Sequence, residues 1–206
     1  MTHTLHRVGE KLEEDYVILM MPSKDINHRG AAPKLRRYLE MALEAGAVKI
    51  GDCRNGNEYH QGGVARILEN LQDQSVVHAV FTTREAVVKA LRLFKAADLG
   101  LCVVVSGLFD RVEKCCQEAG LKKHTINQSM GRWGRTDKLP PPEILQLNTM
   151  CGHGMVSVGL IEDVLADIKS GNCSAEEGAE RLFGPCVCGI FNPHRATLLL
   201  KELAGR

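Results

Sequence analysis

The chain is poor in aromatic residues, nearly neutral and without a long apolar run, and each shortage argues against a class of function. Aromatic residues make up 4% of the 206 residues, too few for a surface on which single-stranded nucleic acid stacks. The formal net charge of +1 gives no excess of positive charge for nucleic acid or an anionic membrane. The longest apolar runs, such as 99–105, are too short to span a bilayer. We therefore expect neither nucleic acid nor a membrane as a partner.

Two cofactor motifs and a leader sequence are also missing. The glycine patterns match neither a dinucleotide fingerprint nor a phosphate-binding loop, which argues against NAD and ATP. Residues 1–15 are polar and charged, without the apolar segment of a secretory signal, so we expect a loosely held tail and a cytoplasmic protein. In a reducing compartment the eight cysteines should be free or metal-bound thiols rather than disulfides.

Short apolar runs alternate with segments of helical periodicity from residue 16 onward. The predicted strands are 16–21, 48–50, 76–81, 99–105 and 125–128, and the predicted helices are 34–45, 63–71, 84–97 and 109–119. This alternation is typical of a mostly parallel sheet, Rossmann-like or flavodoxin-like, with helices on both faces. We therefore predict an α/β domain over residues 16–137.

The proline-rich connector at 138–142 marks a predicted domain boundary. Beyond it the periodicity is helical and no convincing strand follows. Three helices are predicted there. One spans 156–169, and a second begins at Ser174, with Glu177 placed for a capping box. The third runs from Pro193 to residue 204. Residues 138–206 are therefore predicted to form a small helical subdomain that carries cysteine-bearing loops.

Three cysteines of this subdomain stand in glycine- and proline-rich loops: Cys151 in Cys-Gly-His-Gly, and Cys186 and Cys188 in Pro-Cys-Val-Cys-Gly. Glycine lets backbone N–H groups approach sulfur atoms closely, as the thiolate ligands of a metal or cluster require. Structural zinc hairpins usually place two or more residues between paired cysteines, whereas one residue separates Cys186 from Cys188. The spacing therefore favours a 4Fe–4S cluster on these three cysteines, with zinc as the alternative.

Three thiolates leave one iron of such a cluster open, unless Cys53, Cys173 or His153 supplies a fourth ligand. An open iron polarises an oxygen or sulfur atom of a bound substrate as a Lewis acid. His153 lies between two glycines, where it has little to pack against, and is predicted to act in acid–base catalysis or to hydrogen-bond the cluster. Because no hydride-cofactor motif is present, we expect a lyase that dehydrates or desulfurates a small anionic substrate.

Polar loops that follow the predicted strands supply candidate substrate-binding residues. Lys24 and Arg29 lie after the first strand and would hold an anionic group together with the N-terminus of the next helix. Cys53 follows the second strand, at an edge where open α/β sheets bind ligands. These loops, the loop at 106–109 and the segment at 124–134 are expected at one edge of the sheet, because all of them follow strands of a parallel sheet.

Two more residues complete the predicted substrate site. Asn127 lies in the segment 124–134, where polar residues alternate as they would along one side of a cleft. Arg195, near the start of the last predicted helix, would bind a carboxylate or neutralise a reduced cluster.

The same cysteines are compatible with other functions. A non-enzymatic metal or cluster carrier, or an electron-transfer partner in a larger redox complex, would need a coordinatively complete site and no substrate pocket. A zinc-stabilised interaction module would hold zinc in place of iron. A disulfide switch between Cys186 and Cys188 is disfavoured, because closing a ring over one intervening residue strains the bond. A homo-oligomer is compatible with each of these functions.

Overall fold

The computed structural model describes residues 6–205, which divide into two compact units. The sheet unit comprises residues 13–124 and 187–190. The helical unit comprises the described residues up to Leu12, together with 125–186 and 191–205. The predicted domain ranges, 16–137 and 138–206, stay a prediction, because a division into compact units does not show which part of the chain folds alone.

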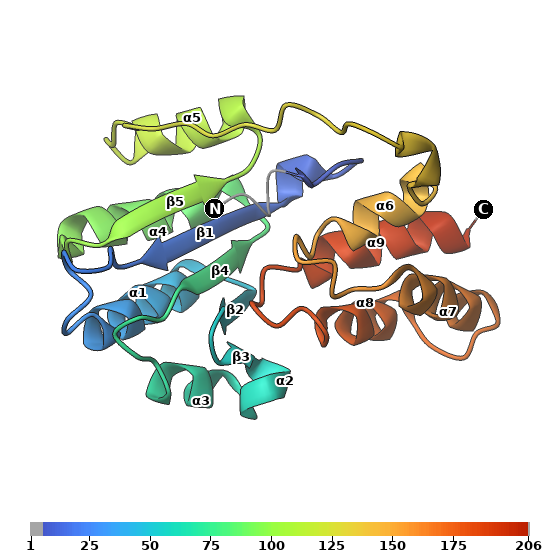
Figure 1. Ribbon diagram of the computed structural model, residues 1–206, viewed down its shortest axis with the longest axis horizontal. Coiled ribbons are helices and arrows are strands. Elements are labelled where there is room, and N and C mark those ends of the chain that lie inside the picture. Colours follow the sequence, from blue (N-terminus) through green and yellow to red (C-terminus); the bar gives the residue numbers. More distant parts are fainter. Residues whose placement is uncertain (1–5, 206) are drawn as a thin grey trace. The chain divides into compact units, whose positions relative to one another are not determined.

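The sheet unit is built on a five-stranded sheet with the strand order β3-β2-β4-β1-β5 (Figure 1). The strands are β1 (Tyr16–Met21), β2 (Lys49–Asp52), β3 (Gly56–Asn57), β4 (Val77–Phe81) and β5 (Cys102–Ser106). Each pair of neighbouring strands is antiparallel. The prediction of a mostly parallel, Rossmann-like or flavodoxin-like sheet is therefore wrong.

The strand directions explain why the sequence pattern predicted a parallel sheet. β1 and β2 both run antiparallel to β4, so they share a direction, and helix α1 (Ala32–Ala45) connects them across the inserted β4. In the same way helix α4 (Arg84–Ala97) connects β4 to β5 across β1. These are two interleaved split β-α-β units. Periodicity predicts strands and helices but does not show whether another strand lies between two connected ones.

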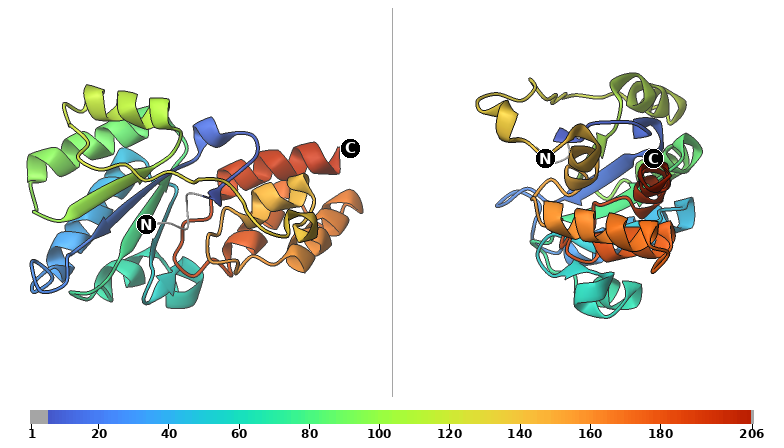
Figure 2. Two further views of the ribbon diagram at one scale, coloured as in Figure 1. Left: turned by 45° about the horizontal axis from the view of Figure 1, so that its top comes forward. Right: turned by 90° about the vertical axis from the view of Figure 1, so that its right-hand side faces the viewer.

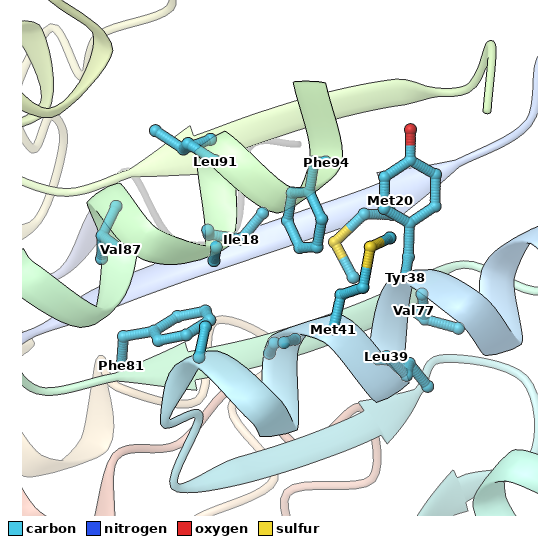
Figure 3. Close-up of a cluster of buried hydrophobic side chains, with 14 of the residues drawn as sticks. Ile18, Met20, Tyr38, Leu39, Met41, Val77, Phe81, Val87, Leu91 and Phe94 are labelled. Carbon is cyan, nitrogen blue, oxygen red and sulfur yellow. The ribbon is translucent and has the colours of Figure 1, made fainter. Parts of the chain in front are cut away.

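The core of the sheet unit lies on one face of the sheet, as Figure 3 shows for side chains of β1, β4, α1 and α4. Helices α3 (Val64–Glu69) and α5 (Phe109–Glu118) add Ile67 and Cys115 to the same cluster, whereas α2 (Glu58–Gln61) has no buried residue. The helices that bury side chains in this core therefore lie on the same face of the sheet. The buried side chains of the opposite face include Val17, Leu19 and His78.

Local signals account for where the helices begin and end. Pro33 stands in the first turn of α1, and Gly46 ends that helix with φ of 106°. The Thr83 side chain caps α4 by accepting a hydrogen bond from the N–H of Ala86, and α4 has the predicted bounds. Residues 125–128, by contrast, form no strand and are not part of the sheet.

The helical unit contains four α-helices that pack together (Figure 2): α6 (Pro142–Asn148), α7 (Val158–Lys169), α8 (Ala175–Phe183) and α9 (Pro193–Ala204). The predicted capping box is confirmed, since Ser174 and Glu177 exchange hydrogen bonds between side chain and backbone at the start of α8. Short 3-10 helices lie at Leu12–Glu14, at the junction of the two units' chain segments, and at Thr136–Lys138. Among residues 6–205, every helix is too short or too polar to cross a membrane.

Candidate metal centre

Two cysteines and a histidine of the sheet unit bring their side chains together. The ligand atoms of Cys53, His78 and Cys188 all lie within 4.8 Å of one another, and Cys53 Sγ is 3.4 Å from His78 Nδ1. His78 is fully buried, Cys188 is 2% exposed and Cys53 is partly exposed. Thiolate sulfur and imidazole nitrogen are ligands of zinc and of other transition metals, so this group could bind a metal ion.

The pairing of β2 with β4 places the first two residues. Gly51 lies opposite His78 in the register of these strands. Cys53 stands two positions after Gly51 and therefore projects from the same face of the sheet, because side chains alternate along a strand. The Cys53 N–H donates to the Val76 carbonyl at 2.9 Å, which continues the pairing beyond the end of β2. Cys53 and His78 are thus diagonal neighbours on one face.

Two glycines bring Cys188 to the same place. A Cβ atom on Gly51 would lie 2.4 Å from the carbonyl oxygen of Cys188, and one on Gly189 would lie 2.8 Å from the carbonyl oxygen of Ile50. Gly189 also has φ of 72°, a conformation that costs glycine little. Only residues without a side chain let the segment 187–190 approach β2 so closely. This approach places the Cys188 thiol beside Cys53 and His78.

The other two predicted cluster ligands lie in the helical unit. Cys151 and Cys186 are buried, and their thiols are hydrogen-bonded. The hydrogen bond to Cys186 is the largest cause of a raised pKa at Cys151, and burial is the second. The N–H groups of His153 and Met155 donate to the Cys151 sulfur and lower its pKa by less. The eight cysteines, all of which lie in the described part of the chain, form no disulfide bond. A 4Fe–4S cluster on Cys151, Cys186 and Cys188 stays a prediction.

His153, the predicted acid–base residue, has an exposed side chain. Its backbone N–H donates a hydrogen bond to the Cys151 sulfur. Asn127 is also exposed and lies in a segment without helix or strand. The catalytic role of His153 and the substrate-binding role of Asn127 therefore stay predictions.

Lys24 and Arg29 are exposed in the loop after β1, and neither forms an ion pair with a described residue. The helix start that was expected to bind a substrate anion holds a carboxylate of the chain itself. Asp73 accepts hydrogen bonds from the N–H groups of Ala32 at 3.0 Å and Gly30 at 2.8 Å. These bonds hold the pKa of Asp73 below its usual value.

Arg195 is fully buried in the helical unit. Its Nε donates to the carbonyl oxygen of Glu10 at 2.9 Å, and its Nη2 donates to that of Val8 at 2.7 Å. The guanidinium thus fastens the N-terminal segment of the described chain to the start of α9. Both of these N–H groups donate to backbone carbonyls. The binding of a substrate carboxylate by Arg195 stays a prediction.

The antiparallel sheet separates loops that were expected at one edge. The loops after β1 and β2 lie at the same end of the sheet, because these strands run in the same direction. β5 runs the opposite way, so the loop at 106–109 lies at the other end. Lys24, Arg29 and Cys53 therefore share an end of the sheet, and the loop after β5 does not.

Sequence reasoning marked Cys53 and Cys188 but missed His78. The histidine stands in the apolar run 76–81, which predicts only a buried strand. The sequence signal for this site is a histidine within one predicted strand and a cysteine just after another. That signal becomes specific only when the two strands are known to be neighbours.

Comparison with known proteins finds no matching family model, no matching curated protein and no matching solved structure.

Proposed function

We propose that the chain is a metal-binding protein whose centre is held by Cys53, His78 and Cys188. The observation that carries the proposal is the convergence of three transition-metal ligands within 4.8 Å, two of them buried. A single metal ion would be held by the two thiolates and the imidazole at once. Metal binding requires the thiols to lose their protons, so binding should strengthen as the pH rises.

The donor pair of Cys53 and His78 has the spacing of two ligands on a single tetrahedral ion. Ligand atoms with bonds of ~2.0–2.3 Å to a tetrahedral ion lie ~3.3–3.8 Å apart. The 3.4 Å between Cys53 Sγ and His78 Nδ1 falls in that range. The ligand types suit zinc or ferrous iron better than magnesium or calcium, which prefer oxygen. Two thiolates and a neutral imidazole would balance the charge of a divalent ion, which favours burial.

Three protein ligands leave the fourth position of a tetrahedral ion for water or a substrate, as in catalytic zinc sites. Cys53, the partly exposed ligand, marks the side from which a small molecule would enter. We propose that a substrate oxygen or sulfur atom takes this position, where a metal ion supplies Lewis-acid polarisation. Lys24 and Arg29 share this end of the sheet and would attract an anionic substrate. We propose that the protein is a lyase that acts on such a substrate.

A 4Fe–4S protein is the second candidate. It is favoured by the hydrogen-bonded thiols of Cys151 and Cys186 and by the position of Cys188 two residues further along the chain. Such a cluster would serve either the same lyase chemistry or a carrier and electron-transfer role. The two candidates use different cysteines and can be separated by substitution.

Metal analysis after anaerobic purification tests both candidates. About one zinc or iron ion per chain, lost in His78→Ala and retained in Cys151→Ser, would support the single-ion centre. About four irons and four sulfides, retained in His78→Ala and lost in Cys151→Ser, would support the cluster. Cys102→Ser serves as the control, because Cys102 lies on β5, which β4 and β1 separate from β2, and is not a candidate ligand of either centre. A wild-type protein that binds neither metal nor cluster after reconstitution would refute both.

A further inference from the structure

We propose that Asp52 is a positioning residue of the metal centre, an inference that rests on the proposed function. Asp52 is the last residue of β2 and precedes Cys53 in the chain. Because side chains alternate along a strand, the Asp52 carboxylate projects to the face opposite Cys53 and is not itself a ligand. We infer that it acts through the backbone, by holding Cys53 in place beside His78.

The carboxylate of Asp52 is fully buried and joins two parts of the sheet unit. Its Oδ1 accepts a hydrogen bond from the Arg54 N–H at 3.0 Å. Its Oδ2 accepts from Asn55 Nδ2 at 3.1 Å and from Ser75 Oγ at 2.7 Å. Arg54 and Asn55 belong to the turn that carries Cys53. Ser75 lies just before β4, which carries His78. The carboxylate therefore ties the segment of one proposed ligand to the segment of another.

These bonds go beyond what a turn requires. An aspartate that bonds the N–H two residues later forms an ordinary Asx turn, which needs one acceptor oxygen and works at the surface. Asp52 adds a bond to Ser75, itself fully buried, and a bond to Asn55. Asn55 in turn donates to the Asn70 carbonyl at 3.0 Å. Burying a carboxylate is costly unless hydrogen bonds compensate. The arrangement is explained if the position of the turn matters for the neighbouring thiol.

A metal site gives such positioning a measurable consequence. The residues that orient metal ligands typically change metal affinity about 10–100-fold when they are substituted. Asp52→Asn keeps the size of the side chain but replaces an acceptor oxygen with an N–H₂ donor. The Arg54 N–H and the Asn55 amide then compete for a single oxygen. We expect the turn to loosen and the Cys53 sulfur to lose its position. Ser75→Ala should act in the same direction with a smaller loss, because it removes one of the three bonds.

Cobalt(II) binding to the full-length protein tests the proposal, because the visible absorption of cobalt reports the geometry of its ligands. Affinity is measured by competition with a chelator for wild type, Asp52→Asn and Ser75→Ala. Thermal unfolding of each metal-free variant is measured in parallel. Asp73→Asn is the matched control: Asp73 also accepts hydrogen bonds at both oxygens, but from the start of α1 and not beside a ligand.

The proposal expects a loss of cobalt affinity of about 10–100-fold in Asp52→Asn, an altered visible spectrum, and no such change in Asp73→Asn. Wild-type affinity and spectrum in Asp52→Asn would overturn the inference while the metal centre stands. An equal loss of affinity in Asp73→Asn would overturn it as well, since general destabilisation would then explain the effect. If wild type itself binds no cobalt, the proposed function falls and the inference falls with it. Should Asp52→Asn not fold, Ser75→Ala decides: a loss of cobalt affinity that Asp73→Asn does not show supports the inference, and wild-type affinity and spectrum overturn it.

Discussion

Gly51→Ala should separate Cys188 from the rest of the proposed metal centre. The new Cβ would lie 2.4 Å from the Cys188 carbonyl oxygen, 2.8 Å from its carbonyl carbon and 2.9 Å from the Gly189 Cα. All three are backbone atoms, so no side chain can rotate out of the way. Ordinary contact begins at 3.4 Å, and the segment 187–190 must therefore move away from β2 by about 1 Å.

This displacement has two costs. Overpacking in a well-packed interior typically lowers the free energy of unfolding by about 1–3 kcal/mol. A shift of about 1 Å is also large beside a metal–sulfur bond of ~2.3 Å. We therefore expect the metal affinity of Gly51→Ala to fall at least as far as when a residue that orients a ligand is lost, about 10–100-fold. That factor corresponds to about 1.4–2.8 kcal/mol of binding free energy.

Zinc competition against a chromophoric chelator measures the affinity, and urea unfolding of the metal-free protein measures the stability. Gly178→Ala is the matched control, because its Cβ would lie 2.7 Å from Val164 Cγ1 in the helical unit. It should lose stability and keep wild-type zinc affinity. The reasoning is refuted if Gly51→Ala keeps both the stability and the zinc affinity of wild type.

Three further predictions concern stability. Arg195→Leu leaves two backbone carbonyls without their donor and should lower the free energy of unfolding by about 2–4 kcal/mol; an unchanged urea midpoint would contradict the anchoring role. The pKa of Asp73 is lowered in the folded protein, so its contribution is present above the unfolded pKa of about 4 and is lost as the pH falls through the folded pKa. Asp73→Asn should therefore flatten the acid limb of a stability–pH curve, and a limb identical to wild type would count against this. Ser174→Ala removes the cap of α8 and should cost about 1 kcal/mol, measured by thermal unfolding; no loss would mean that the cap is dispensable.

Local sequence signals determined much of the secondary structure. The bounds of α4 and the capping box at Ser174 follow from interactions between residues close in sequence: an apolar period, a cap and a stop. The strands at 16–21 and 76–81 follow from short apolar runs. Cys188 stood out because glycine and proline surround it, and Cys53 stood out because it follows a strand. Each of these features lies within a few residues of the chain.

The tertiary structure alone decided the direction of the strands and the composition of the metal centre. An apolar run indicates that a strand is buried but not which strand lies beside it. The position of β4 between β1 and β2 therefore cannot be predicted from the periodicity of apolar residues. The same limit hid His78, whose role depends on its pairing opposite Gly51. Cys188 reaches this face because two glycines far apart in the chain leave room for each other. Contacts between distant residues depend on how the elements pack, and the spacing along the chain does not record them.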